Sequence, residues 1–183
     1  MKQFPFLLLD AGPIIKLFSL NIWDRFIKHC DITISRIIAN DQALYTEDGT
    51  QQICLEPYEE KGLIKIIDVD VSVVKEFEDK FTPLYKPEIH DGEKETLAFL
   101  FDSSEHWLVC SADHVVFKIL GLLGKAEHGI SLEEILKDVG LAYSVDWEKI
   151  TPRDRQHWRY SKKFREKWTH KGWVDFIQGQ GLR

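Results

Sequence analysis

The feature that most restricts the fold of this chain is a short apolar run that ends on a carboxylate. Residues 6–9 read FLLL, and Asp10 follows them directly. A continuous apolar run of this length suits a strand in the middle of a parallel sheet, where both faces are buried. Gly12 and Pro13 then favour a helix start, because proline fits the first helical turn. We therefore predict a strand followed at once by a helix.

Further strand-length runs alternate with helical stretches along the chain. We expect strands at residues 32–34, 63–67 and 107–110, and helices at residues 13–18, 22–28, 35–45, 71–81, 91–100, 113–123 and 131–140. The last of these helices begins with a capping box, Ser131 to Glu134. Strands separated by helices indicate βα units and a parallel sheet, which places the chain in the α/β class.

Charged residues are distributed unevenly along the chain. Residues 151–183 hold nine Lys and Arg against three Asp and Glu, a net charge of +6. Because the whole chain has a formal net charge of −6, residues 1–150 carry −12, from 15 basic and 27 acidic residues. We therefore expect an acidic domain over residues 1–143 and a basic, aromatic-rich helical extension over residues 144–183.

The cysteines and the apolar runs indicate the compartment. Cys30, Cys54 and Cys110 form no CxxC pair and are odd in number, which favours a reduced, cytoplasmic protein. The apolar run at residues 4–9 is too short for a signal peptide or a membrane span. We expect no membrane partner.

Acidic residues recur at the predicted strand ends and helix starts. The carboxyl ends of parallel strands are where ligands bind in open sheets, and carboxylates that converge there repel one another unless a cation joins them. Each residue also has a plainer interpretation, as a helix cap, as a complement to a helix dipole or as a solvated side chain. The candidate metal ligands are Asp10, Asp41, Glu93, Glu95 and Asp113.

The order of these segments resembles the PIN-domain family of metal-dependent ribonucleases. Residues 7–17 (LLLDAGPIIKL) are similar to the opening strand of that family, with its first acid at Asp10. Residues 34–44 (ISRIIANDQAL) are similar to the segment of the second acid, which is usually Glu and is Asp41 here. Residues 90–100 (HDGEKETLAFL) resemble the GE-x-E form of the third acidic segment, and residues 108–113 (LVCSAD) resemble the closing strand, with Ser111 and Asp113.

The resemblance, which spans roughly residues 5–142, implies a fold, a cofactor and an activity. The implied fold is a three-layer α/β/α sandwich around a central, mostly parallel sheet. Asp10, Asp41, Glu95 and Asp113 would be the catalytic residues and would bind Mg²⁺ or Mn²⁺, and Ser111 would orient a ligand or a water. We favour Glu95 over Glu93 because it lies 18 residues before Asp113, which is closer to the usual spacing in the family. The implied reaction is endonucleolytic cleavage of RNA.

Three functions stay open at this point. The first is a metal-dependent ribonuclease, a class that includes toxins of toxin–antitoxin pairs. The second is a PIN-like module that binds RNA or protein without cleaving, because the shorter side chain of Asp41 leaves room for weakened catalysis. The third is a structural protein that forms homodimers.

The basic extension interleaves cations with aromatic rings over residues 158–173, WRYSKKFREKWTHKGW. This pattern suits phosphate contacts combined with base stacking. The residues expected to contact RNA are Arg159, Lys162, Lys163, Arg165 and Lys167. Two alternatives remain: a helix that packs its aromatic residues on the body and leaves its basic face in solvent, or a surface for a protein partner such as an antitoxin or a second copy.

Overall fold

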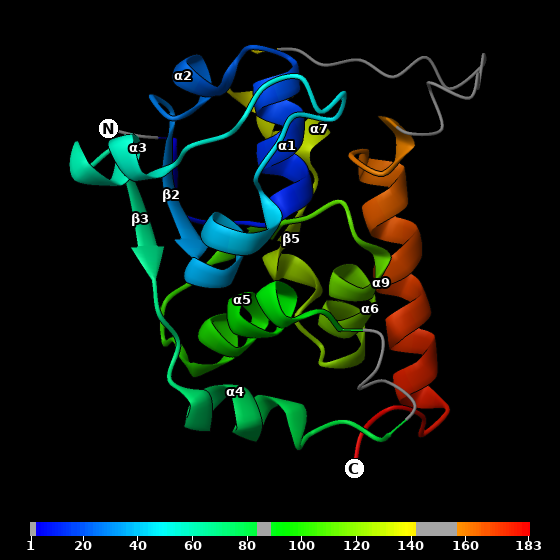
Figure 1. Ribbon diagram of the computed structural model, residues 1–183. Coiled ribbons are helices and arrows are strands. Elements are labelled where there is room, and N and C mark those ends of the chain that lie inside the picture. The colour runs from blue at the N-terminus through cyan, green and yellow to red at the C-terminus, as the bar shows by residue number, and fades with distance from the viewer. Residues whose placement is uncertain (1–2, 84–88, 142–156) are drawn as a thin grey trace.

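The computed structural model describes residues 3–83, 89–141 and 157–183, and its strands form one sheet (Figure 1). The described strands are all parallel, in the order β3-β2-β1-β4-β5. Their bounds are Phe4–Leu9 for β1, Cys30–Ser35 for β2, Ile64–Ile67 for β3, Leu108–Cys110 for β4 and Gly129–Ile130 for β5. The predicted parallel sheet is confirmed. The short strand β5 was not predicted, because two residues carry no readable pattern.

Helices cover both faces of the sheet (Figure 1). One apolar core lies between the sheet and α1, α2 and α7, and a second lies between the sheet and α4, α5 and α6. The predicted α/β/α layering is therefore confirmed. The helices are α1 (Ala11–Ser19), α2 (Trp23–Phe26), the π-helix η1 (Ile38–Gln42), α3 (Glu56–Glu60), α4 (Val71–Glu78), α5 (Asp91–Asp102), α6 (His114–Leu122), the 3₁₀-helix η3 (Ala126–His128), α7 (Leu132–Asp138) and α9 (Lys162–Ile177).

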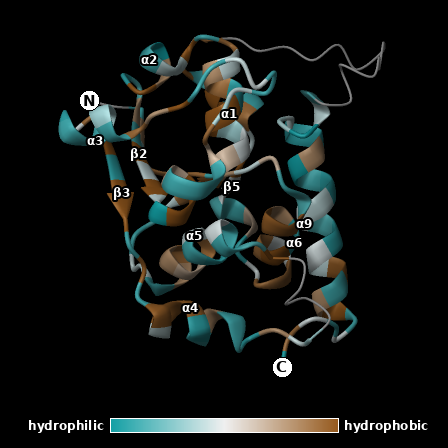
Figure 2. Ribbon diagram, in the orientation of Figure 1, coloured by the Kyte–Doolittle hydropathy of each residue, from teal (hydrophilic) through white to brown (hydrophobic). Residues whose placement is uncertain are grey.

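The apolar run in β1 is explained by its central position in the sheet. Leu7 and Leu9 pack into the core under α1, whereas Leu8 points to the opposite face and packs into the core under α5 and α6. Figure 2 shows hydrophobic residues on β2 and β3 and on parts of α1, α4, α5 and α6. Among the described residues, no helix combines the length and the apolar character that crossing a membrane would need.

The helix predicted at residues 35–45 is much shorter than expected. Ser35 accepts a hydrogen bond from the Ile38 amide at 3.3 Å, as a cap would, but the π-helix ends at Gln42. The chain then turns back at Gly49, whose φ is +70°, and Tyr45 pairs with Gln52 in an isolated bridge. The polar turn at residues 46–52 therefore overrides the helical spacing, and the Tyr45 side chain is exposed.

The C-terminal helix α9 packs closely against α6. A Cβ atom added at Gly172 would collide with the Lys118 carbonyl, and one added at Gly121 would collide with the Thr169 carbonyl. The two backbones are thus in contact, which only glycine permits at these two positions. The predicted helical extension is present in the described residues, although its expected boundary at residue 143 lies outside them.

We expect Gly172→Ala to lower the free energy of unfolding by about 1–3 kcal/mol, because the added methyl group would force α9 away from α6. In an uncrowded helix the same change raises stability by up to ~1 kcal/mol, so the sign of the effect is diagnostic. Urea denaturation would measure it. Glu166→Ala, on the exposed side of α9, is the control, and a neutral or stabilising Gly172→Ala would contradict the close packing.

Candidate metal centre

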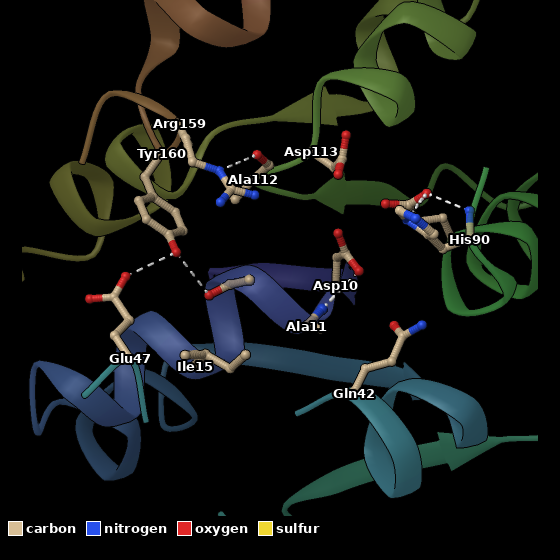
Figure 3. Close-up of a pocket in the computed structure, with 12 residues that line it drawn as sticks. Asp10, Ala11, Ile15, Gln42, Glu47, His90, Ala112, Asp113, Arg159 and Tyr160 are labelled. Atoms are coloured by element: carbon tan, nitrogen blue, oxygen red, sulfur yellow. Dashed lines mark hydrogen bonds and ion pairs between the residues drawn. The ribbon is translucent and has the colours of Figure 1, made fainter. Parts of the chain in front are cut away.

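A cavity of about 340 Å³ opens at the carboxyl ends of β1 and β4, where the starts of α1, α5 and α6 meet (Figure 3). Asp10, at the end of β1, and Asp113, at the start of α6, project into it, and Glu93 of α5 also lines it. The cavity is lined by Asp10, Ala11, Gly12, Ile15, Gln42, Glu47, His90, Glu93, Ala112, Asp113, Arg159 and Tyr160.

Asp10 is held between the end of β1 and the start of α1. Its Oδ1 accepts a hydrogen bond from the Ala11 amide at 2.8 Å, and its Oδ2 accepts one from Ser111 Oγ at 2.5 Å. Burial raises the pKa of Asp10 and the charge of Asp113 adds to the rise, whereas the hydrogen bonds from Ser111 and Ala11 and the charge of Arg159 oppose it. Asp10 therefore caps a helix and lines the cavity at the same time.

Ser111 links the two aspartates. Its hydroxyl oxygen accepts a hydrogen bond from the Asp113 amide at 2.9 Å while its proton is donated to Asp10. Asp113 is the N-cap of α6, and its Oδ1 accepts from the Val115 amide at 3.1 Å and lies 3.1 Å from His114 Nδ1. The hydroxyl of Ser111 therefore contacts the carboxylate of Asp10 and the backbone of Asp113.

Glu93 is the third acid in the cavity and is only 5% exposed. Its Oε2 accepts a hydrogen bond from the His90 amide at 2.9 Å. Burial raises the pKa of Glu93 to about 8, and the nearby charges of Asp10 and Asp113 add to this rise. An acid that is buried beside two others is destabilised when ionised, and a bound cation relieves that penalty.

The donor set fits a divalent cation. One ligand atom from each of His90, Glu93 and Asp113 can be chosen so that all three lie within 4.8 Å of one another. Carboxylate oxygens suit Mg²⁺ and Mn²⁺, and an imidazole nitrogen favours Mn²⁺ over Mg²⁺. Asp10 lies at the same edge of the sheet as these three and lines the same cavity.

Two expected ligands lie away from this group. Asp41 is exposed on η1, and the neighbouring Gln42 lines the cavity instead. Glu95 does not line the cavity, and its Oε2 accepts a hydrogen bond from the Ile37 amide at 3.5 Å. Positions two apart on a helix point about 200° away from each other, so Glu93 and Glu95 cannot both face one cavity. The spacing to Asp113 favoured Glu95, whereas the structure brings Glu93 into the cavity.

Of the five basic residues expected to contact RNA, Arg159 alone lines the cavity. Arg165 forms a two-bond ion pair with Glu134, with both distances at 2.8 Å. Lys167 lies over the rings of Trp158 and Trp168, at 5.2 and 5.3 Å from their centroids. Lys162 and Lys163 are exposed on α9. The expected packing of aromatic residues on the body is therefore present for Trp158, Phe164 and Trp168, in the second core.

Four polar residues of the cavity were not predicted: Gln42, Glu47, His90 and Tyr160. His90 precedes the Asp91-Gly92 helix start, so its place beside Glu93 was readable from the sequence. Glu47 and Tyr160 had no such signal, because the turn at residues 46–52 and the start of α9 reach the cavity only through tertiary packing.

The sequence matches no model of a known protein family, and no curated protein matches it.

The raised pKa of Glu93 predicts how the stability of the metal-free protein depends on pH. A carboxyl whose pKa is raised by folding stabilises the fold while protonated, so the contribution of Glu93 to the free energy of unfolding is complete below about pH 4.5 and falls as the pH rises towards 8. Glu93→Gln would flatten this fall. Urea titrations in EDTA across that range would measure it, with Glu95→Gln as the matched control. Identical pH profiles for Glu93→Gln and the wild type would contradict the prediction.

Proposed function

We propose that this protein is a divalent-metal-dependent nuclease that hydrolyses RNA phosphodiester bonds. The observation that carries the proposal is the convergence of Asp10, Glu93 and Asp113 in one cavity at the carboxyl edge of a parallel sheet. Such a group of buried and partly buried acids is unfavourable without a cation. A site that binds Mg²⁺ or Mn²⁺ next to an open cavity is suited to phosphodiester hydrolysis.

The residues that would hold the cation are Asp10, Glu93 and Asp113, with His90 as a nitrogen donor. When bound, the cation would lower the pKa of an attacking water and stabilise negative charge on phosphate oxygens. The chain supplies the orientation. Ser111 fixes the Asp10 carboxylate through a 2.5 Å hydrogen bond, and the His90 amide fixes Glu93 at 2.9 Å. These carboxylates are therefore ordered before any ligand enters.

RNA as the substrate follows from the resemblance of residues 7–17, 34–44, 90–100 and 108–113 to PIN-domain ribonucleases. The parallel sheet, with Asp10 at the end of β1 and Asp113 at the start of α6, supports this proposal. We further propose a cytoplasmic protein, for which the free cysteines Cys30, Cys54 and Cys110 are support. A toxin role with a partner antitoxin, and a homodimer, are consistent extensions of this proposal.

A second candidate function is binding of RNA or protein without cleavage. It is favoured by the amide of Gln42, which lines the cavity in place of the carboxylate expected from Asp41. With one acid fewer, the cavity holds cations less strongly. Binding of RNA without any metal-dependent cleavage would select this candidate over the nuclease.

We expect Mn²⁺-dependent cleavage of single-stranded RNA that falls at least ~100-fold in Asp10→Asn, Glu93→Gln and Asp113→Asn, because each change removes a charge that the cation needs. Glu95→Gln and Asp41→Asn are matched controls that remove the same charge outside the cavity, and they should stay within a few-fold of wild type. Gel electrophoresis of a labelled oligonucleotide would measure the rates. Equal rates of cleavage by the wild type and by Asp113→Asn would contradict the proposed nuclease activity.

Metal binding itself has a separate signature. We expect Mn²⁺ to raise the melting temperature at neutral pH, since a ligand that binds only the folded state adds about 2.7 kcal/mol at one hundred times its Kd. The rise should be smaller in Glu93→Gln and unchanged in Glu95→Gln. A thermal shift that is the same in all three proteins would place the cation elsewhere.

A further inference from the structure

We propose that Arg159 binds a phosphate of the RNA strand in the cavity, so that the C-terminal segment completes the active site. This inference rests on the proposed nuclease function and assigns one basic residue to the substrate. Arg159 enters from the turn before α9, on the side of the cavity that lies across from His90, with Asp10 and Asp113 between them (Figure 3).

The guanidinium of Arg159 is fixed at the end of β4. Its Nε donates a hydrogen bond to the Ala112 carbonyl at 3.1 Å, and Ala112 lies between Ser111 and Asp113 in the sequence. Among the described acidic side chains, none forms an ion pair with Arg159. Within the part of the chain that the structure describes, the two terminal nitrogens have no acidic partner, and their paired N–H groups match two oxygens of a phosphate.

The backbone next to Arg159 is anchored through Tyr160. Tyr160 is buried, and its hydroxyl lies 3.3 Å from both the Gly12 carbonyl and Glu47 Oε1. The Tyr160 carbonyl accepts a hydrogen bond from the Glu133 amide at 3.0 Å. Because Gly12 and Glu47 themselves line the cavity, the same contacts that fix Tyr160 fix the position of Arg159 relative to the acids.

Charge balance supports this assignment. Asp10, Glu93 and Asp113 carry a formal charge of −3 when ionised, and Glu47 is paired with Lys16 Nζ at 2.7 Å. One divalent cation and Arg159 together supply +3. Without Arg159, an RNA phosphate would enter a cavity that still carries a net negative charge and would be repelled. The arginine thus provides a permanent cation on the side away from His90 and Glu93.

Other cations of the same segment are less suited to this contact. Arg165 is paired with Glu134, and Lys167 lies over two tryptophan rings. Neither lines the cavity. Phosphate contact inside the cavity therefore depends on Arg159 rather than on the general basic character of α9.

The test is binding of a fluorescein-labelled single-stranded oligouridylate, read by fluorescence anisotropy in Ca²⁺, with gel electrophoresis to verify that the RNA stays intact. We expect Arg159→Ala to weaken binding roughly 10- to 100-fold and to reduce the slope of log affinity against log salt by about 1. Arg159→Lys should bind with intermediate affinity, since it keeps the charge but loses the paired donors. Arg25→Ala removes an exposed arginine on α2 and should bind as wild type does.

The outcomes separate the two proposals. If wild type cleaves RNA with Mn²⁺ and Arg159→Ala binds as tightly as Arg25→Ala, the role of Arg159 is wrong and the nuclease stands. If the loss of affinity in Arg159→Ala is matched by a loss of melting temperature, the residue is structural and the inference is overturned. The inference is likewise overturned if Arg159→Lys, which keeps the charge, binds RNA no better than Arg159→Ala does. If wild type neither binds nor cleaves RNA, both proposals fail.

Discussion

The parallel pairing of β1 with β4 is the constraint on which the rest of the site depends. Leu9 lies opposite Cys110 in this register, and each strand is followed directly by a polar residue, Asp10 or Ser111. The hydrogen bond between them closes the end of the sheet and draws Asp113 to the same edge. A slip of β4 by one residue would turn Val109 to the wrong core and separate the acids, so core packing also fixes the site.

Much of this arrangement was readable in the sequence because it depends on local patterns. Apolar runs of strand length predicted β1, β3 and β4. Asp10 and Asp113 were recognised as candidate ligands because they come shortly after the first and the last of these runs. The capping box at Ser131 gave the start of α7. These signals are strong because each lies within a few residues of the feature that it specifies.

The remainder depends on contacts between distant segments. The π-helix η1 ends at Gln42 instead of continuing to residue 45, and within it Asp41 is exposed while Gln42 lines the cavity. The choice between Glu93 and Glu95 could have been made from helix geometry, but family spacing pointed to the other residue. The place of Tyr160 had no local signal at all, since its partners Gly12 and Glu47 are far away in the sequence.

The hydroxyl of Tyr160 joins the start of α9 to the start of α1 across 148 positions. This contact cannot form until both of these distant segments have been synthesised. During synthesis, Asp10 emerges long before Arg159 and Tyr160 do. A nascent chain therefore carries the acidic side of the cavity without its basic side, and the complete cavity can exist only after the last helix has docked on α6.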